Sequence, residues 1–164
     1  MIAEVFRPAG LSLEWYTAPD GVPASAARTL AVWFHGDCWP MAAGEFQRLL
    51  PAPVRLGWVL SHDGHIGADI EVDCTLVMRV AAEAQSSTNR TLSCAAFLRL
   101  MERVVSHELM HVLLMSAGHG TSDCTRARLQ PSEWRRIGHL THSELDLLRE
   151  LYNPEASVVW APTR

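Results

Sequence analysis

The chain has 164 residues, which is enough for one ordinary domain and too few for two. Apolar residues make up 48% of it and charged residues 20%, as in ordinary globular proteins. The net charge of −4 and the lack of a basic run argue against nucleic acid as a partner, and no apolar stretch is long enough to cross a membrane. We therefore expect one domain over residues 1–164 that acts as a monomer.

The first thirty residues predict the end of a helix, a short strand and a loop. A helix over residues 1–9 would be stopped by Pro8 and Gly10. The segment 18–26, "APDGVPASA", is typical of a loop because it is rich in proline and glycine. Between them, three apolar residues alternate with polar ones and predict a half-buried strand: Leu11, Leu13 and Trp15.

Three further strands are expected before the middle of the chain. The run "TLAVWFHG", residues 29–36, is nearly continuous in apolar residues, which is typical of a strand covered on both faces. The segment 56–72, "LGWVLSHDGHIGADIEV", predicts two strands on either side of the turn-rich "SHDGH".

The second half of the chain predicts two helices. A long helix over about residues 91–116 follows the polar "QSSTNR" and would be ended by Gly118 and Gly120. After a loop, Thr141 and Glu144 in "LTHSELDLLRELY" form a capping box that would begin a last helix. Strands with a helix before and after them favour an α/β layer whose sheet is mixed rather than purely parallel.

The segment "SHELMHVLLMSAGHG", residues 106–120, carries the chemistry that stands out. His107 and His111 are four residues apart, so on a helix they project from one face and can hold one zinc ion. Glu108 would then lie beside the metal rather than on it. Burying these groups without partners in the most apolar helix of the chain would cost several kcal/mol. A metal would supply the missing partner.

Zinc in a catalytic site takes a third protein ligand and leaves one position open for water. His119 is the best candidate, because Gly118 and Gly120 let the chain double back below the helix. An acidic residue further along remains open as an alternative: Asp123, Glu133 or Glu144. The other histidines are expected to be surface or turn residues: His35, His62, His65, His139 and His142.

The segment "HELMHVLLMSAGHG" resembles the zinc helix of metzincin metallopeptidases, whose usual pattern is H-E-x-x-H-x-x-G-x-x-H. It is most similar to a bacterial metzincin-like group in which the third histidine falls two residues later, as His119 does here. Other segments resemble the second and third strands of the family, the strand before its zinc helix and its C-terminal helix: "AGLSLEW", "TLAVWFHGD", "GADIEVD" and "LTHSELDLLRELY". The resemblance implies an α/β (α+β) fold in which a mixed, mostly parallel sheet packs on a central zinc-binding helix, with a helix at the C-terminus.

The sequence departs from the family pattern in two places near the motif. Leu114 stands where the family has the glycine at which the chain turns, so the turn is expected to be delayed to Gly118. Met115 is the last methionine, although the family places one in a turn beneath the metal. We expect residues 123–129 to form that turn, with Thr125 or Leu129 in place of the methionine, and Thr125→Met to be tolerated or mildly stabilising.

A third departure concerns the N-terminus. The first strand of the family and most of its first helix would precede Met1, so the chain is either a shortened version or has had its start assigned too far downstream. The first residues do not resemble a signal peptide. Secretion is favoured only if the true start lies upstream, and the location is otherwise open.

The resemblance implies zinc-dependent hydrolysis of peptide bonds, with Zn²⁺ on His107, His111 and His119 and with Glu108 as the general base. An extended peptide or protein substrate would add to a sheet edge around residues 56–60. The main alternative is a non-catalytic zinc-binding interaction module, which the retention of Glu108 argues against. A zinc hydrolase with glutamate as its third ligand is a further possibility.

The four cysteines contain no C-x-x-C pair, so a zinc ribbon is excluded. In metzincins the strands that end in "FHGDC" and "IEVDC" are parallel neighbours, so the resemblance implies that Cys38 and Cys74 could form a disulfide. Two buried thiols are the alternative.

Overall fold

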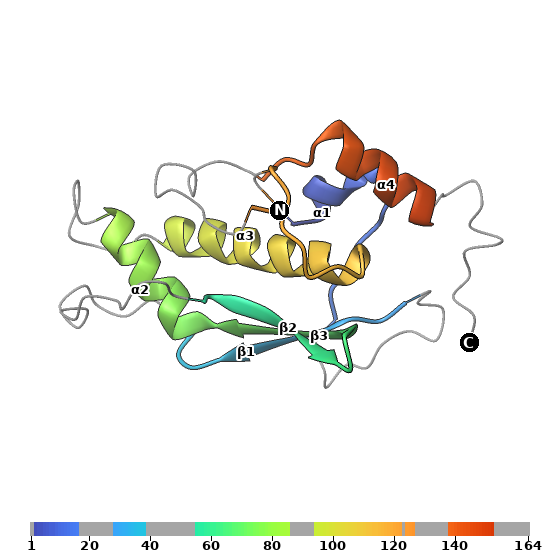
Figure 1. The fold of residues 1–164 in the computed structure, drawn as a ribbon. Helices are drawn as coiled ribbons and strands as arrows, with labels where there is room; N and C mark the ends of the chain where they lie inside the picture. The colour runs from blue at the N-terminus through green and yellow to red at the C-terminus, as the bar shows by residue number, and fades with distance from the viewer. Residues whose placement is uncertain are drawn as a thin grey trace.

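The computed structural model of the protein describes residues 2–16, 28–38, 55–85, 94–122, 124–126 and 138–152. Within these ranges the fold is mixed α and β, with one three-stranded sheet and four α-helices (Figure 1). The elements in chain order are α1 (Ile2–Phe6), the 3-10 helix η1 (Arg7–Ala9), β1 (Ala31–His35), β2 (Gly57–His62), β3 (His65–Asp73), α2 (Cys74–Gln85), α3 (Cys94–Leu113) and α4 (His142–Tyr152). None of these helices is long and apolar enough to cross a membrane.

Helix α3 lies at the centre of three layers (Figure 1). The sheet packs on one side of it, α1 and α4 lie on the other side, and α2 packs against it near its N-terminal end. Its buried side chains form much of the core together with two fully buried residues of β3, Ile70 and Val72. The predicted mixed α/β arrangement is therefore confirmed.

The sheet has the strand order β1-β3-β2. Strand β1 runs parallel to β3, and β2 runs antiparallel to it, so the sheet is mixed but not mostly parallel among the described strands. The predicted hairpin in "SHDGH" is confirmed: Asp63 and Gly64 both have positive φ, 50° and 79°. Two such residues make the tight turn whose twist matches that of paired strands.

Two expectations for the strands are wrong, and one helix was missed. Residues 11–16 adopt no regular structure, and no described strand pairs with them. Strand β1 is not covered on both faces, because Trp33 and Phe34 are 52% and 49% exposed. Helix α2 was not predicted, because it follows β3 without a break. Asp73 is its N-cap and accepts a hydrogen bond from the N–H of Leu76 (2.9 Å). The loop expected over residues 18–26 lies outside the described residues.

Helix α3 ends in a turn that differs from the one expected. The N–H of Met115 donates to the carbonyl of Val112 (3.3 Å), and the N–H of Ser116 donates to that of His111 (3.0 Å). Met115 is left-handed, with φ of 48°. These features define a Schellman ending with methionine where glycine is usual. The turn is therefore not delayed to Gly118, which is not left-handed.

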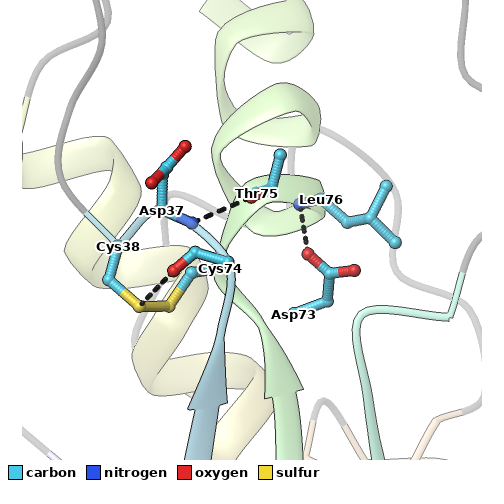
Figure 2. The surroundings of a disulfide bond; sticks show 7 residues. Asp37, Cys38, Asp73, Cys74, Thr75 and Leu76 are labelled. Carbon is cyan, nitrogen blue, oxygen red and sulfur yellow. Dashed lines mark hydrogen bonds between the residues drawn. A yellow bond between two sulfur atoms is a disulfide. The ribbon is translucent and has the colours of Figure 1, made fainter.

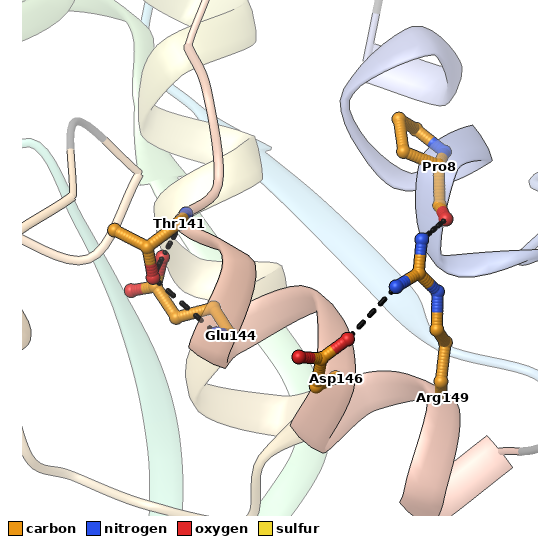
Figure 3. Close-up of polar contacts among 5 residues, drawn as sticks. All are labelled: Pro8, Thr141, Glu144, Asp146 and Arg149. Carbon is orange, nitrogen blue, oxygen red and sulfur yellow. Dashed lines mark hydrogen bonds and ion pairs between the residues drawn. The ribbon is translucent and has the colours of Figure 1, made fainter.

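Helix α4 begins with the predicted capping box, which is confirmed (Figure 3). The backbone N–H of Thr141 donates to Oε2 of Glu144 (2.7 Å), and the N–H of Glu144 donates to Oγ1 of Thr141 (3.3 Å). Further along α4, Arg149 donates to the carbonyl of Pro8 (2.7 Å) and Tyr152 donates to that of Leu113 (2.7 Å). The last turn of α3 has carbonyls without helical partners, so Tyr152 fixes α4 to the end of α3.

A disulfide joins Cys38 to Cys74, as the family resemblance implied (Figure 2). The Cα atoms are 4.8 Å apart, and the bond ties the segment after β1 to the first residue of α2. The backbone N–H of Asp37 also donates to Oγ1 of Thr75 (3.1 Å), which holds the same two segments together. Cys94 and Cys124 carry thiols.

Candidate metal centre

Three histidines converge beside the C-terminal half of α3. His107 and His111 lie on the helix, and His119 approaches them from the segment that follows it. Their ligand nitrogens all lie within 4.8 Å of one another, and the three ring centroids are 4.7–5.2 Å apart. The predicted trio is therefore brought together, and it is a group that could hold a metal ion.

Two backbone carbonyls orient the helical pair. Nδ1–H of His107 donates to the carbonyl of Cys124 (2.8 Å), and Nδ1–H of His111 donates to that of Ser116 (2.7 Å). Each ring then has an unprotonated Nε2, since a neutral imidazole carries one proton. This is the arrangement by which a histidine ligand is usually held.

The two Nε2 atoms face each other at 3.1 Å. With both protons on Nδ1, two lone pairs meet there and neither atom can donate, so the contact needs a proton or a cation between the rings. Zinc–nitrogen bonds of about 2.0–2.1 Å in tetrahedral geometry place two ligand nitrogens about 3.3 Å apart. The spacing of His107 and His111 therefore fits a metal ion with little movement.

The surroundings lower the pKa of two of the three histidines, His107 and His119. Burial lowers the pKa of His107 to about 4, and the charge of His111 adds to this effect. Burial also lowers the pKa of His119, with His111 again contributing. Only a deprotonated ring nitrogen can bind a metal, so at neutral pH these two rings are already in the binding form.

Glu108 lies next to this trio but outside it. Its side chain is buried, 6% exposed, and packs over the start of β2. A Cβ at Gly57 would lie 3.2 Å from Oε1 of Glu108 and 2.8 Å from Cγ1 of Val104, so glycine leaves room for the carboxylate. Burial raises the pKa of Glu108 to about 7, although the charge of Arg55 opposes the rise. A carboxyl with a pKa near neutrality is suited to proton transfer.

The segment after α3 folds back on itself before it reaches α4. The N–H of Gly120 donates to the carbonyl of Thr125 (3.1 Å), and the N–H of Thr125 donates to Oγ of Ser122 (3.1 Å). Gly120 does not have positive φ, so conformational freedom is not the reason for glycine there. A Cβ at Gly120 would press into Oγ1 of Thr125 and lie 3.0 Å from Oε1 of Glu144.

Thr125, the residue expected in place of the family's methionine, contacts α4 through its side chain. Its side chain is buried, and its hydroxyl donates to Oε1 of Glu144 (2.5 Å). The neighbouring residue, Cys124, makes the contact with His107 through its carbonyl. Thr125→Met was expected from the sequence to be tolerated or mildly stabilising, but a thioether would remove this buried hydrogen bond, so the structure favours a loss of stability instead. Leu129 lies outside the described residues.

Among the alternative third ligands, Glu144 is not part of the trio. It accepts a hydrogen bond from Ser122 in the segment after α3 instead. Asp123 and Glu133 lie outside the described residues. The five other histidines are exposed, as predicted: His35, His62, His65, His139 and His142. Sequence reasoning missed the carbonyls of Ser116 and Cys124, because a backbone carbonyl leaves no signal in residue type. It found Glu144 as a cap, but not its contacts with the loop.

Comparisons with protein-family models, with curated proteins and with solved structures found no match to this chain.

Proposed function

We propose that the protein is a zinc-dependent metalloendopeptidase of the metzincin type. One observation carries the proposal: the Nε2 atoms of His107 and His111 face each other at 3.1 Å, with His119 beside them and Glu108 on the same helix. Three imidazoles suit zinc, although copper, iron and nickel also accept such ligands. A structural zinc site usually has four protein ligands, whereas three leave a position for water.

Zinc bound by these histidines would supply a water of lowered pKa and an electrophile for the substrate carbonyl. Glu108 performs the proton transfers. Its carboxylate takes a proton from the attacking water and passes it to the amine of the departing peptide. The packing of Glu108 against Gly57 excludes water from one side of the carboxylate.

The peptide substrate would add to the free side of β2. Strand β2 lies at an edge of the described sheet and pairs with β3 on one side only. Its first residue, Gly57, lies against Glu108, so an extended peptide along this edge would run past the proposed catalytic group. This supports the predicted docking edge at residues 56–60.

The disulfide bears on where the protein works. Cys38 and Cys74 are bonded in the structure, and disulfides persist mainly in oxidising compartments. We infer that the protein functions outside the reducing cytosol.

The first test replaces Glu108 by glutamine. Glu108→Gln should retain about the same amount of zinc per chain, because the histidines supply the bonds, and should lose roughly 10²–10⁴-fold in the rate of peptide cleavage. Zinc content and hydrolysis of an unstructured protein substrate measure the two effects. Glu150→Gln is the matched control: it removes one exposed carboxylate from α4 and should leave both unchanged.

One outcome would favour the alternative of a zinc-binding interaction module. In that case the zinc-loaded wild type would cleave nothing in a broad peptide library, and Glu108→Gln would behave identically. Peptidase activity would then be excluded, while the metal site would stand.

A further inference from the structure

We propose that Glu144 is a positioning residue of the metal centre: its carboxylate fixes Ser122 and Thr125, and through them His119 and the carbonyl that orients His107. The proposal rests on the metal site proposed above but not on peptidase activity. Glu144 lies on α4, and no atom of it belongs to the metal-binding trio.

The two carboxylate oxygens of Glu144 have separate tasks. Oε2 accepts hydrogen bonds from the N–H and the hydroxyl of Thr141 (2.7 and 2.9 Å), which makes the cap of α4 (Figure 3). Oε1 accepts from the hydroxyls of Ser122 (2.9 Å) and Thr125 (2.5 Å), which belong to the segment after α3. A helix cap needs only the first set, so the second set indicates an additional role.

The contacts of Oε1 lead directly to the metal ligands. Thr125 follows Cys124, whose carbonyl accepts from Nδ1–H of His107 (2.8 Å). Thr125 also accepts from the N–H of Gly120, the residue after His119 (3.1 Å). Glu144 therefore holds Thr125 directly, and through Thr125 it holds the residues that position His107 and His119.

The alternative is that Glu144 stabilises only the fold. Two sets of substitutions separate the roles, because they remove different hydrogen bonds of one carboxylate. Thr141→Ala removes the side-chain part of the cap and leaves Ser122 and Thr125 in place. The double variant Ser122→Ala/Thr125→Val removes the loop contacts and leaves the cap in place, with little change in side-chain volume for the valine.

The experiment measures zinc dissociation constants by competition with a chromophoric chelator at neutral pH, and the absorption spectrum of the cobalt-substituted protein at equal occupancy. The loop double variant and Glu144→Gln should bind zinc roughly 10–100-fold more weakly, as expected for groups that orient ligands. Their cobalt spectra should be altered, because the ligand geometry is relaxed. Thr141→Ala should lower the melting temperature but change zinc affinity less than twofold. Glu150→Gln should match the wild type in every measurement.

Two outcomes would overturn the assignment. The first is wild-type zinc affinity and an unaltered cobalt spectrum in the loop double variant. The second is a loss of affinity in Thr141→Ala as large as that in the loop double variant, which would trace the effect to the stability of α4. A wild-type protein that binds neither zinc nor cobalt would instead refute the metal site itself.

Discussion

At the scale of single residues, Arg103 is a buried charged residue of α3. It lies one turn before His107 and is only 4% exposed. None of its three guanidinium nitrogens has a hydrogen-bond partner among the described residues. Gly138 lies so close that a Cβ there would be 2.7 Å from Nη1 of Arg103. A buried charge without a partner destabilises the folded state, so this residue should weaken the fold.

We predict that Arg103→Met raises the free energy of unfolding by about 1–4 kcal/mol, because methionine fills similar space without a charge. Urea unfolding of the zinc-free protein measures the change. Arg99→Met is the matched control, since Arg99 is exposed on the same helix and should change stability by no more than about 0.5 kcal/mol. A marked destabilisation by Arg103→Met would contradict the prediction and would mean that the charge is compensated.

At the scale of elements, α4 depends on pH through Glu144. Burial raises the pKa of this carboxyl, but hydrogen bonds from Thr125, Thr141 and Ser122 outweigh burial and leave the pKa below its ordinary value. A group whose pKa is lower in the folded state stabilises that state above its unfolded pKa, and the contribution is lost as pH falls through the folded pKa. The junction between α4 and the loop should therefore weaken in acid.

We predict that the melting temperatures of the wild type and of Glu144→Gln depend differently on pH. Between about pH 5 and pH 3 the melting temperature of the wild type should fall more steeply than that of Glu144→Gln, which cannot titrate at this position. Thermal unfolding followed by circular dichroism across this range tests it. Parallel curves for the two proteins would show that Glu144 contributes nothing to the acid sensitivity.

The elements that could be predicted from sequence are those with local signals. The Asp63–Gly64 turn, the apolar periodicity of α3 and the capping box at Thr141 are all encoded within a few residues. Helix α2 also has a local signal, an Asp73 N-cap before a helical apolar pattern, but the adjoining strand hid it. The turn at Met115 could not be predicted, because left-handed methionine is uncommon and its fit here depends on the surrounding structure.

In the candidate site, too, some features could be predicted from the sequence and others could not. The pair His107 and His111 follows from helical periodicity, and His119 from its short distance along the chain. The carbonyl of Cys124 and the loop contacts of Glu144 arise only when segments far apart in sequence meet. Periodicity therefore identifies the candidate ligands, whereas tertiary packing determines what holds them.

At the scale of the whole molecule, the disulfide is the one covalent constraint among the described residues. Cys38 and Cys74 are 36 residues apart in sequence. A cross-link that closes a loop of this length stabilises the folded state by about 3–4 kcal/mol in the chain-entropy model, because it restricts the unfolded chain. Reduction should therefore affect the stability of the entire domain.

Oxidised, denatured protein should show two titratable thiols without reductant and four with it, since Cys94 and Cys124 are the remaining cysteines. The variant Cys38→Ser/Cys74→Ser should lose about 3–4 kcal/mol of unfolding free energy. Cys94→Ser is the control, because that thiol is exposed and should be replaceable at little cost. Four thiols from oxidised material would contradict the disulfide.

Different backbone segments hold the two helical histidines: the end of α3 holds His111, and the loop beyond it holds His107. This difference determines which contact a bound ion would lose first. The carbonyl of Ser116 holds the ring of His111, and the N–H of Ser116 donates a hydrogen bond in the turn that ends α3. The support of His111 therefore persists for as long as this last turn of α3 stays folded. His107 and His119 depend on Cys124 and Thr125, which lie beyond the helix. Loop segments open more readily than packed helices. An ion leaving the centre would therefore lose His119 and the alignment of His107 first, and would make its last contact with His111.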